Sequence, residues 1–478
     1  MKSSPLTQWP YFWAFKNYGL TLAHARVITI IYFTLFIIVT FFLLFKRYKL
    51  PLTLLTLLLL TTDVALFNFS RSILFETAII FFIYTGIIFV SHVQYAKPLQ
   101  AVTIVTIFAL IATFTIKKSA ILYCVPSILA CCGLVIFNSK RNKGNFLYLI
   151  VLALMLSYLA IITRGMWLPR IHQDTISQVT TRFFLNPIPD LSIIAILLAY
   201  SCILHIAIIK PRMLYLDLYR LCLVATVIGA PLMLSFIKYN PPRYYVPIIP
   251  ACLLLCVEWI HLKLWKLPIK FPLTTFHKIC IVALIIPFSM FLLRSINILI
   301  LEKIPYNIGQ DPGISLSGLY KLFPFFSLIV IVFFFFNQKR SFATLNLLIP
   351  LLIIAHIVTG VVTQTNILMH PSFDSRDIGK TLKNQIKSSE SVAGDWAPFF
   401  TANEPIRSLY MSKGINKPTP AHIKKLRPDY FLSSNSPFDP LSLNLLKSNK
   451  AIRLDKPKML GVYMNHDIKL YRIEYLEE

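Results

Sequence analysis

Uninterrupted apolar stretches follow one another from residue 25 to residue 363, and they limit the folds that this chain can adopt. About twelve such stretches lie near residues 25–45, 51–69, 73–91, 99–116, 119–137, 145–163, 191–209, 217–237, 244–262, 279–300, 318–336 and 341–363. Each is close to the roughly 20 residues that a helix needs to cross a hydrocarbon core of about 30 Å. Because they lack the alternation of barrel strands, the sequence predicts an all-α polytopic membrane protein with about twelve transmembrane helices.

The composition agrees with a membrane protein and excludes several other classes. Only 14% of the residues are charged, whereas a soluble domain carries about 25%. The formal charge of +27 comes from basic residues in short loops between apolar stretches, and no nucleic-acid-binding motif accompanies it. No nucleic-acid partner is therefore predicted. All eight cysteines fall inside apolar stretches, which predicts small buried side chains rather than disulfides or a zinc site.

The character of the chain changes after residue 365. Residues 366–478 hold 12 of the 20 acidic residues, and helical and strand-like stretches alternate there. The sequence predicts a helix over residues 376–387 and strands at 391–394, 428–432 and 469–475. We therefore expect a multi-span transmembrane domain over 1–365 and a small soluble α/β domain over 366–478.

Basic residues in alternate loops predict the orientation of the spans. The loops at 46–49, 97, 140–143, 210–212, 263–270 and 339–340 are the richer set, have no other evident role and are assigned to the cytoplasm. The other loops contain Arg71, Lys117, Lys118 and Arg243 and then face outward. With an even number of spans the C-terminal domain also lies outside, in the periplasm of a bacterium whose inner (plasma) membrane holds the chain.

Arg71 stands between two apolar stretches, with Glu76 five residues further along. A charge at membrane depth costs roughly 2.5–3.5 kcal/mol even on the lenient insertion scale, so a function is the first hypothesis. The cations expected on the outer face, Arg71, Lys117, Lys118 and Arg243, suit a lipid phosphate at headgroup depth. The alternative is that each of them snorkels to headgroups independently. Glu76 would bind a sugar, orient a cation, or be a buried carboxylate satisfied by another helix. Asp63, a lone carboxylate in the span before Arg71, is expected to pair locally.

Several short motifs occur in the order found in a known superfamily. They are Tyr18-Gly19 with Ala25-Arg26, Phe69-Ser70-Arg71 with Glu76, Thr115 to Lys118, and Arg243-Tyr244 with Pro247 and Pro250. Residues 391–398 and 427–431 are similar to the small outer domain of many bacterial members. Together they resemble the GT-C membrane glycosyltransferases, and most of all the bacterial members of the dolichyl-phosphate-mannose protein mannosyltransferase superfamily, which include the lipid A aminoarabinose transferase. The resemblance covers most of the chain.

The resemblance implies a hexosyl or pentosyl transferase that takes its sugar from a polyprenyl-phosphate donor. The acceptor would be a lipid, glycan or protein at the outer face, among the membrane lipids. Arg71, Lys117, Lys118, Arg243 and Tyr244 would bind the donor, and Glu76 is the candidate catalytic residue. A divalent cation is compatible with this chemistry, but no other cofactor and no metal-ligand cluster is predicted.

One departure from the superfamily bears on activity. Its members place a first span and an outer loop with the acidic general base ahead of the segment that matches residues 11–30. In this sequence no Asp or Glu precedes Asp63, so we expect an N-terminally shortened form that lacks the first span and first outer loop, and the catalytic base is unknown. Two alternatives stay open, namely a lipid-linked glycan transporter or flippase and a catalytically inactive fragment.

Overall fold

The structure is a computed structural model of the whole chain. It describes residues 5–18, 22–70, 76–117, 120–138, 188–209, 211–214, 216–235, 242–264, 338–369, 374–387, 389–394, 396–401, 406–410, 425–434, 440–447, 452–463 and 466–476, with the single positions 282, 285, 289, 404 and 423. The chain divides into two compact units. The first comprises residues 1–13, 25–303 and 317–365, and the second comprises 14–24, 304–316 and 366–478.

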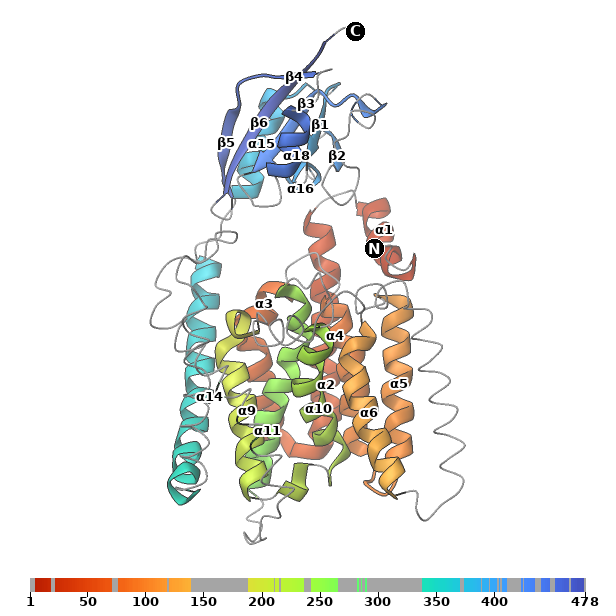
Figure 1. Cartoon of the computed structure of the whole chain (residues 1–478), viewed down its shortest axis with the longest axis vertical. Helices are drawn as coiled ribbons and strands as arrows, with labels where there is room; N and C mark the ends of the chain where they lie inside the picture. Colours follow the sequence, from red (N-terminus) through yellow and green to blue (C-terminus); the bar gives the residue numbers. More distant parts are fainter. Residues whose placement is uncertain are drawn as a thin grey trace. The chain divides into compact units, whose positions relative to one another are not determined.

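The described segments before residue 370 are almost entirely helical, and most of the longer helices of the first unit run nearly parallel to one another (Figure 1). In chain order they are α1 (Pro5–Tyr18), α2 (Leu22–Thr62), α3 (Val64–Ser70), α4 (Glu76–Phe89), η1 (Val90–His92), α5 (Pro98–Thr115), α6 (Ile121–Asn138), α9 (Ile188–Ile209), η4 (Pro211–Leu214), α10 (Leu218–Ser235), η5 (Pro242–Ile248), α11 (Ile249–Leu264) and α14 (Gln338–Met369).

The apolar stretches and the helices coincide wherever the chain is described. Within those segments five helices are long and apolar enough to cross a membrane, and three shorter apolar helices accompany them. The stretches at 145–163, 318–336 and almost all of 279–300 lie outside the described residues, so the number twelve stays a prediction. The helical, membrane-spanning character of this part of the chain is established by these helices.

The helix α2 contains two of the predicted stretches. Its apolar part from residue 26 to 62 has 37 residues, about 56 Å of helix, which is too long for a single crossing. Its backbone leaves helical geometry at Lys49, where φ is 61° and ψ is 179°, and Pro51 follows. The predicted loop at 46–49 is therefore reduced to one non-helical residue between two helices.

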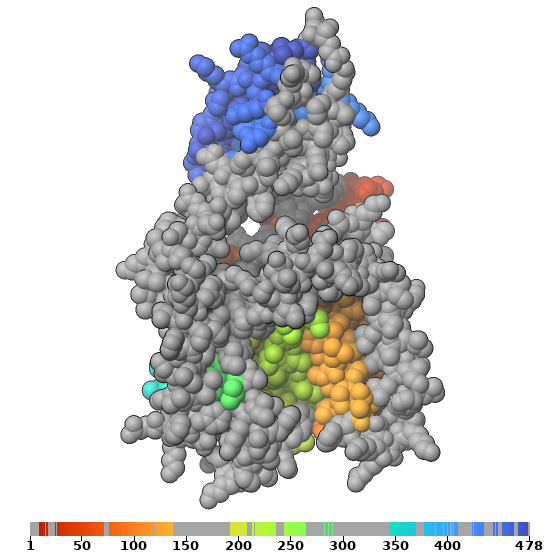
Figure 2. Space-filling view, viewed as in Figure 1, coloured from red at the N-terminus to blue at the C-terminus, as the bar shows by residue number. Residues whose placement is uncertain are grey.

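The helices of the first unit pack closely through small residues and hydroxyl groups. A side chain at Gly229 of α10 would collide with Pro126 of α6. Beside this contact the Ser127 hydroxyl donates to the carbonyl oxygen of Cys222 at 2.8 Å and lies 2.9 Å from the Thr226 hydroxyl. α6 contacts both α5 and α10, and Figure 2 shows an orange and a green surface side by side in this part of the chain. Large apolar side chains such as Leu129 and Leu232 remain exposed on these helices, as expected for contact with lipid.

The second unit contains a six-stranded mixed sheet in its described part. Its elements are α15 (Asp374–Gln385), β1 (Ser391–Gly394), α16 (Ala397–Phe400), β2 (Arg407–Tyr410), β3 (Tyr430–Ser434), α18 (Pro440–Lys447), β4 (Ile452–Leu454), β5 (Lys458–Tyr463) and β6 (His466–Tyr475). The strand order is β2-β1-β3-β6-β4, and β5 also pairs with β6. β2, β1 and β3 are parallel, whereas β6 is antiparallel to β3, β4 and β5.

Alternation along the strands gives this sheet two apolar faces. One face contacts α15 and α16 through residues such as Leu382, Leu432 and Leu470. The other face packs on Leu446 of α18 through Phe431 and Tyr471, among others. The helix expected at 376–387 and the strands expected at 391–394, 428–432 and 469–475 are confirmed, and their ends differ from the predicted ones by at most three residues. The C-terminal region is thus an α/β fold.

Candidate functional site

Three of the residues selected from the sequence meet at one end of the first unit. Glu76 is the first residue of α4, Lys117 follows the end of α5, and Arg243 lies in η5. The Lys117 ammonium is 3.2 Å from the Glu76 carboxylate, and Arg243 Nε is 3.9 Å from the same oxygen. The Lys117 ammonium also lies over the Tyr244 ring, 4.2 Å from its centroid. Glu76, Lys117, Arg243 and Tyr244 are called the Glu76 cluster below.

The end of α5 fixes where Lys117 leaves the helix. The main-chain amides of Ile116 and Lys117 both donate to the carbonyl oxygen of Ala112, so the last turn closes on a shared acceptor. The Lys117 carbonyl then accepts from the amide of Ala120, and the chain turns at once into α6. This tight turn points the lysine side chain to the start of α4.

The three charged side chains of the Glu76 cluster differ in exposure. The Glu76 side chain is 2% exposed, that of Lys117 is 16% exposed, and that of Arg243 is 39% exposed. Glu76 also stands at the N-terminus of α4, where the helix dipole favours a carboxylate. The charges of Glu76, Lys117 and Arg243 sum to +1, and Arg243 is the most exposed of the three. Its Nε atom has no hydrogen-bond partner within the described residues.

Two buried tyrosines hold η5 in place, and sequence reasoning missed both. The Tyr84 hydroxyl of α4 donates to the carbonyl oxygen of Pro247 at 2.6 Å and accepts from the amide of Ala251 at 3.2 Å. The Tyr123 hydroxyl of α6 donates to the carbonyl oxygen of Tyr244 at 2.7 Å. These bonds satisfy main-chain groups that a short 3-10 segment cannot pair internally. The only sequence signal was a polar-tipped aromatic residue within an apolar helix.

Not every predicted site residue can be placed. Arg71 and Lys118 lie outside the described residues. Asp63, expected to pair locally, stands between α2 and α3, where its carboxylate accepts from the Leu66 amide at 2.9 Å. It also accepts from the Ser192 hydroxyl at 2.7 Å, and His356 Nε2 is 4.0 Å away. The prediction of a local partner is confirmed, and two distant helices, α9 and α14, converge on the same carboxylate.

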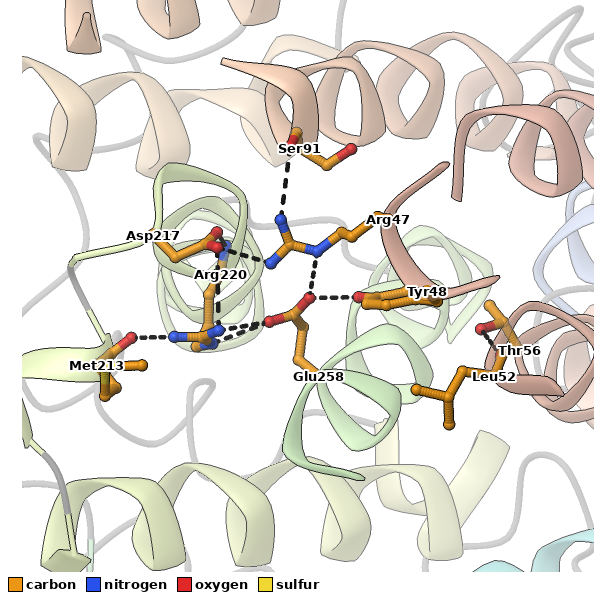
Figure 3. Close-up of polar contacts among 9 residues, drawn as sticks. All are labelled: Arg47, Tyr48, Leu52, Thr56, Ser91, Met213, Asp217, Arg220 and Glu258. Carbon is orange, nitrogen blue, oxygen red and sulfur yellow. Dashed lines mark hydrogen bonds and ion pairs between the residues drawn. The ribbon is translucent and has the colours of Figure 1, made fainter. Parts of the chain in front are cut away.

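A second charged cluster lies at the opposite end of α4 and α11 (Figure 3). Glu258 of α11 accepts from Arg47 Nε at 2.7 Å, from Arg220 at 3.0 and 2.7 Å, and from the Tyr48 hydroxyl. Arg47 also pairs with Asp217 at 2.6 Å and reaches the Ser91 carbonyl at 3.5 Å, whereas Arg220 donates to the Met213 carbonyl.

We call this the Glu258 network, and it corrects the interpretation of Arg47. From the sequence, Arg47 was assigned no role other than marking a cytoplasmic loop. The two arginines and two carboxylates of the network sum to zero charge, and Glu258 is completely buried. The network joins α2, α10 and α11, which explains why a charge at residue 258 is tolerated. Its groups satisfy one another, so it is a structural connection rather than a binding site.

The described residues contain no group of three or more His, Cys, Asp or Glu side chains that could hold a metal ion. The seven cysteines that can be described are all buried thiols, as the sequence predicted. The chemistry available at the Glu76 cluster is therefore that of cations, one carboxylate and an aromatic ring.

Comparison with known proteins gives structural neighbours only. No family profile matches the sequence, and no curated protein matches it. Two crystal structures of ArnT from Cupriavidus metallidurans are similar to the chain, one bound to undecaprenyl phosphate and one in the apo state. They are 11% and 12% identical with TM-scores of 0.46 and 0.49, and each alignment covers 98% of this chain and 87% of the other. This likeness assigns no residue role and no activity to the chain.

Proposed function

We propose that this chain is a glycosyltransferase of the bacterial inner membrane that takes a sugar from a polyprenyl-phosphate donor. The acceptor is a lipid, glycan or protein at the outer face, where the Glu76 cluster and the C-terminal domain would both lie. The observation that carries the proposal is the meeting of Lys117 and Arg243 on one carboxylate at a helix-bundle end. That depth is where the phosphate of a membrane lipid lies.

The cluster has the charge and geometry to receive a phosphate. Arg243 is the most exposed of its charged groups, although its Nε atom is buried. A phosphate oxygen that reaches the guanidinium from its exposed side would accept a charge-assisted hydrogen bond. During transfer the bond from the anomeric carbon to the phosphate oxygen breaks, and negative charge grows on the leaving phosphate. Fixed cations at that point stabilise the transition state.

Glu76 has a positioning role in this proposal. Its carboxylate is buried and faces two cations, whereas a general base must come within hydrogen-bond reach of the acceptor. Glu76 instead holds Lys117 against the Tyr244 ring and balances one of the two positive charges. It is the counter-ion that keeps the two cations side by side before a phosphate arrives.

The flippase alternative would line a path with basic residues from both ends of the bundle. Two of the basic residues at the end opposite the Glu76 cluster are not available for such a path. At the end opposite the Glu76 cluster, Arg47 and Arg220 are buried and neutralised by Asp217 and Glu258. Those two arginines cannot serve a moving anionic headgroup.

The test substitutes Lys117 and Arg243, and its control is Lys97 at the other end of α5 from Lys117. Lys117→Gln and Arg243→Gln should each lower transfer from a radiolabelled polyprenyl-phosphate sugar in membranes by at least about tenfold, as expected for loss of a charge-assisted contact. Lys97→Gln removes an exposed lysine at the N-terminus of α5 and should leave transfer unchanged. Equal transfer by all three variants, at equal protein levels, would refute the assignment of the phosphate site.

A further inference from the structure

A cleft in the second unit shares no residue with the Glu76 cluster and has no role in the proposed transfer. It has a volume of about 440 Å³ and opens between the end of α15 and the sheet. Its lining residues are Asn384, Gln385, Tyr430, Asp455, Lys456, Lys458, Leu470 and Arg472. They come from four separate segments, α15, β3, the β4–β5 connection with the start of β5, and β6, so the fold assembles the cleft.

Positive charge dominates this cleft. Lys456, Lys458 and Arg472 are exposed cations, and Asp455 is the single acid in the lining. None of the three cations forms an ion pair with an acidic side chain that the structure describes, although Lys383 and Lys469 nearby in the same unit do. Glu390 hydrogen-bonds the Tyr430 hydroxyl beside the cleft. Three cations against the single acid of the lining favour an anionic ligand.

The remaining lining groups suit a sugar. Tyr430 presents a partly exposed aromatic ring at the start of β3, opposite Arg472 in the register of β3 and β6. Asn384 at the end of α15 is exposed, and its side-chain amide can both donate to and accept from sugar hydroxyls. Gln385 beside it also lines the cleft, but its side-chain carbonyl oxygen is buried.

We propose that this cleft binds an anionic saccharide, with the sugar ring on Tyr430, a hydroxyl group hydrogen-bonded to the Asn384 amide and the negative charge between Lys458 and Arg472. The charge is a carboxylate or a phosphate, since both accept hydrogen bonds from Lys and Arg. This inference does not rest on the proposed transferase activity. It assigns the second unit a ligand of its own.

The opposite face of the same sheet provides the matched control. Lys447 of α18 is an exposed lysine there and lines a second hollow with Ile452 and Tyr471, which shares only Asp455 with the cleft. Lys380 of α15 is exposed on the same helix as Asn384 and Gln385 but does not line the cleft. Changing either lysine to glutamine alters the net charge of the unit by the same amount as a change in the cleft.

The test is calorimetric titration of the full-length protein in nanodiscs with three probes. Trigalacturonate carries carboxylates, glucose 6-phosphate carries a phosphate, and maltotriose is neutral. At least one anionic probe should bind, and Arg472→Gln or Lys458→Gln should weaken it by about tenfold, the usual effect of losing a charged hydrogen bond. Arg472→Lys keeps the charge and should weaken binding less. Lys447→Gln and Lys380→Gln should bind as the unaltered protein does.

Each outcome of this titration either supports or overturns the proposal. Binding of one anionic probe alone supports the proposal and identifies its charged group. Equal binding of maltotriose, no binding of any probe, or equal weakening by the cleft and control substitutions would overturn it. The cleft substitutions are at exposed positions, and unchanged thermal unfolding of each variant shows that lost binding is not lost folding. Because the readout is binding, a failed transfer assay with the Lys117 and Arg243 variants leaves this result independent.

Discussion

The Tyr123 hydroxyl donates a 2.7 Å hydrogen bond to the main-chain carbonyl oxygen of Tyr244, across 121 residues of sequence. This bond ties α6 to η5, and Tyr84 of α4 makes a corresponding bond to Pro247. The position of Arg243 and Tyr244 beside Lys117 therefore depends on two phenols of neighbouring helices. They position the site through the main chain of this segment.

Tyr123→Phe should loosen η5 without changing the shape of the core. The substitution leaves the Tyr244 carbonyl buried and without its donor, which costs about 1–3 kcal/mol. We expect a lower unfolding temperature and a several-fold weaker transfer, with the double variant Tyr84→Phe/Tyr123→Phe lower still. Thermal unfolding and transfer assays of purified protein measure both effects. Tyr95→Phe, beyond η1 at the other end of α4, is the control, and an equal loss in that variant would show that the effect is unspecific.

Glu258→Gln should be among the most destabilising single changes in the first unit. It leaves Arg47 and Arg220 without their shared carboxylate in a buried site, and breaking such a pair costs about 3–5 kcal/mol. Folded yield and denaturant unfolding in detergent would report the loss. Lys46→Gln, at the exposed neighbour of Arg47, should be neutral.

The Glu258 network also leads us to predict the effect of a double substitution. Arg47→Met/Glu258→Met removes one charge of each sign and leaves Asp217 and Arg220, which are 3.9 Å apart, to balance each other. This double variant should be more stable than Glu258→Gln alone, since no uncompensated charge stays buried. If the double variant is the less stable of the two, the charge balance of the network is not what stabilises it.

A feature could be predicted from the sequence where the residues that form it lie close together along the chain. The apolar stretches are contiguous, and the four residues of the Glu76 cluster lie in short contiguous motifs. The spans and these four residues could therefore be selected from the sequence, although their contacts could not. The Glu258 network joins positions 211 and 38 residues apart, and nothing near Glu258 in the sequence marks its partners. Arg47 was interpreted through its neighbours Lys46 and Lys49, which are exposed, because burial depends on helix packing that a single sequence does not show.

Asp63→Ala should loosen the corner between α2 and α3. The carboxylate caps α3 through the Leu66 amide and holds the Ser192 hydroxyl of α9, and loss of a cap alone costs about 1 kcal/mol. Hydrogen exchange of peptides from α3 should become faster, because the first turn loses its acceptor. Thr61→Ala removes a hydroxyl that bonds only within its own helix in the described structure, to Leu57 and Leu58, and should leave that exchange unchanged.

The C-terminal strand should become less stable in strongly alkaline solution. Burial and the neighbouring Asp429 raise the pKa of Tyr475 from 10.0 to about 12, whereas Arg427 beside its ring lowers it. The neutral hydroxyl donates to the Pro428 carbonyl at 3.0 Å, and a phenolate cannot. Since the folded pKa lies above the unfolded one, this contribution to stability is complete below pH 10 and is lost as the pH rises from 10 to 12. Hydrogen exchange of β6 peptides across that range should accelerate in the unaltered protein. Tyr475→Phe, which has no proton to lose, should show a smaller acceleration, and equal acceleration in both proteins would assign the effect to another group.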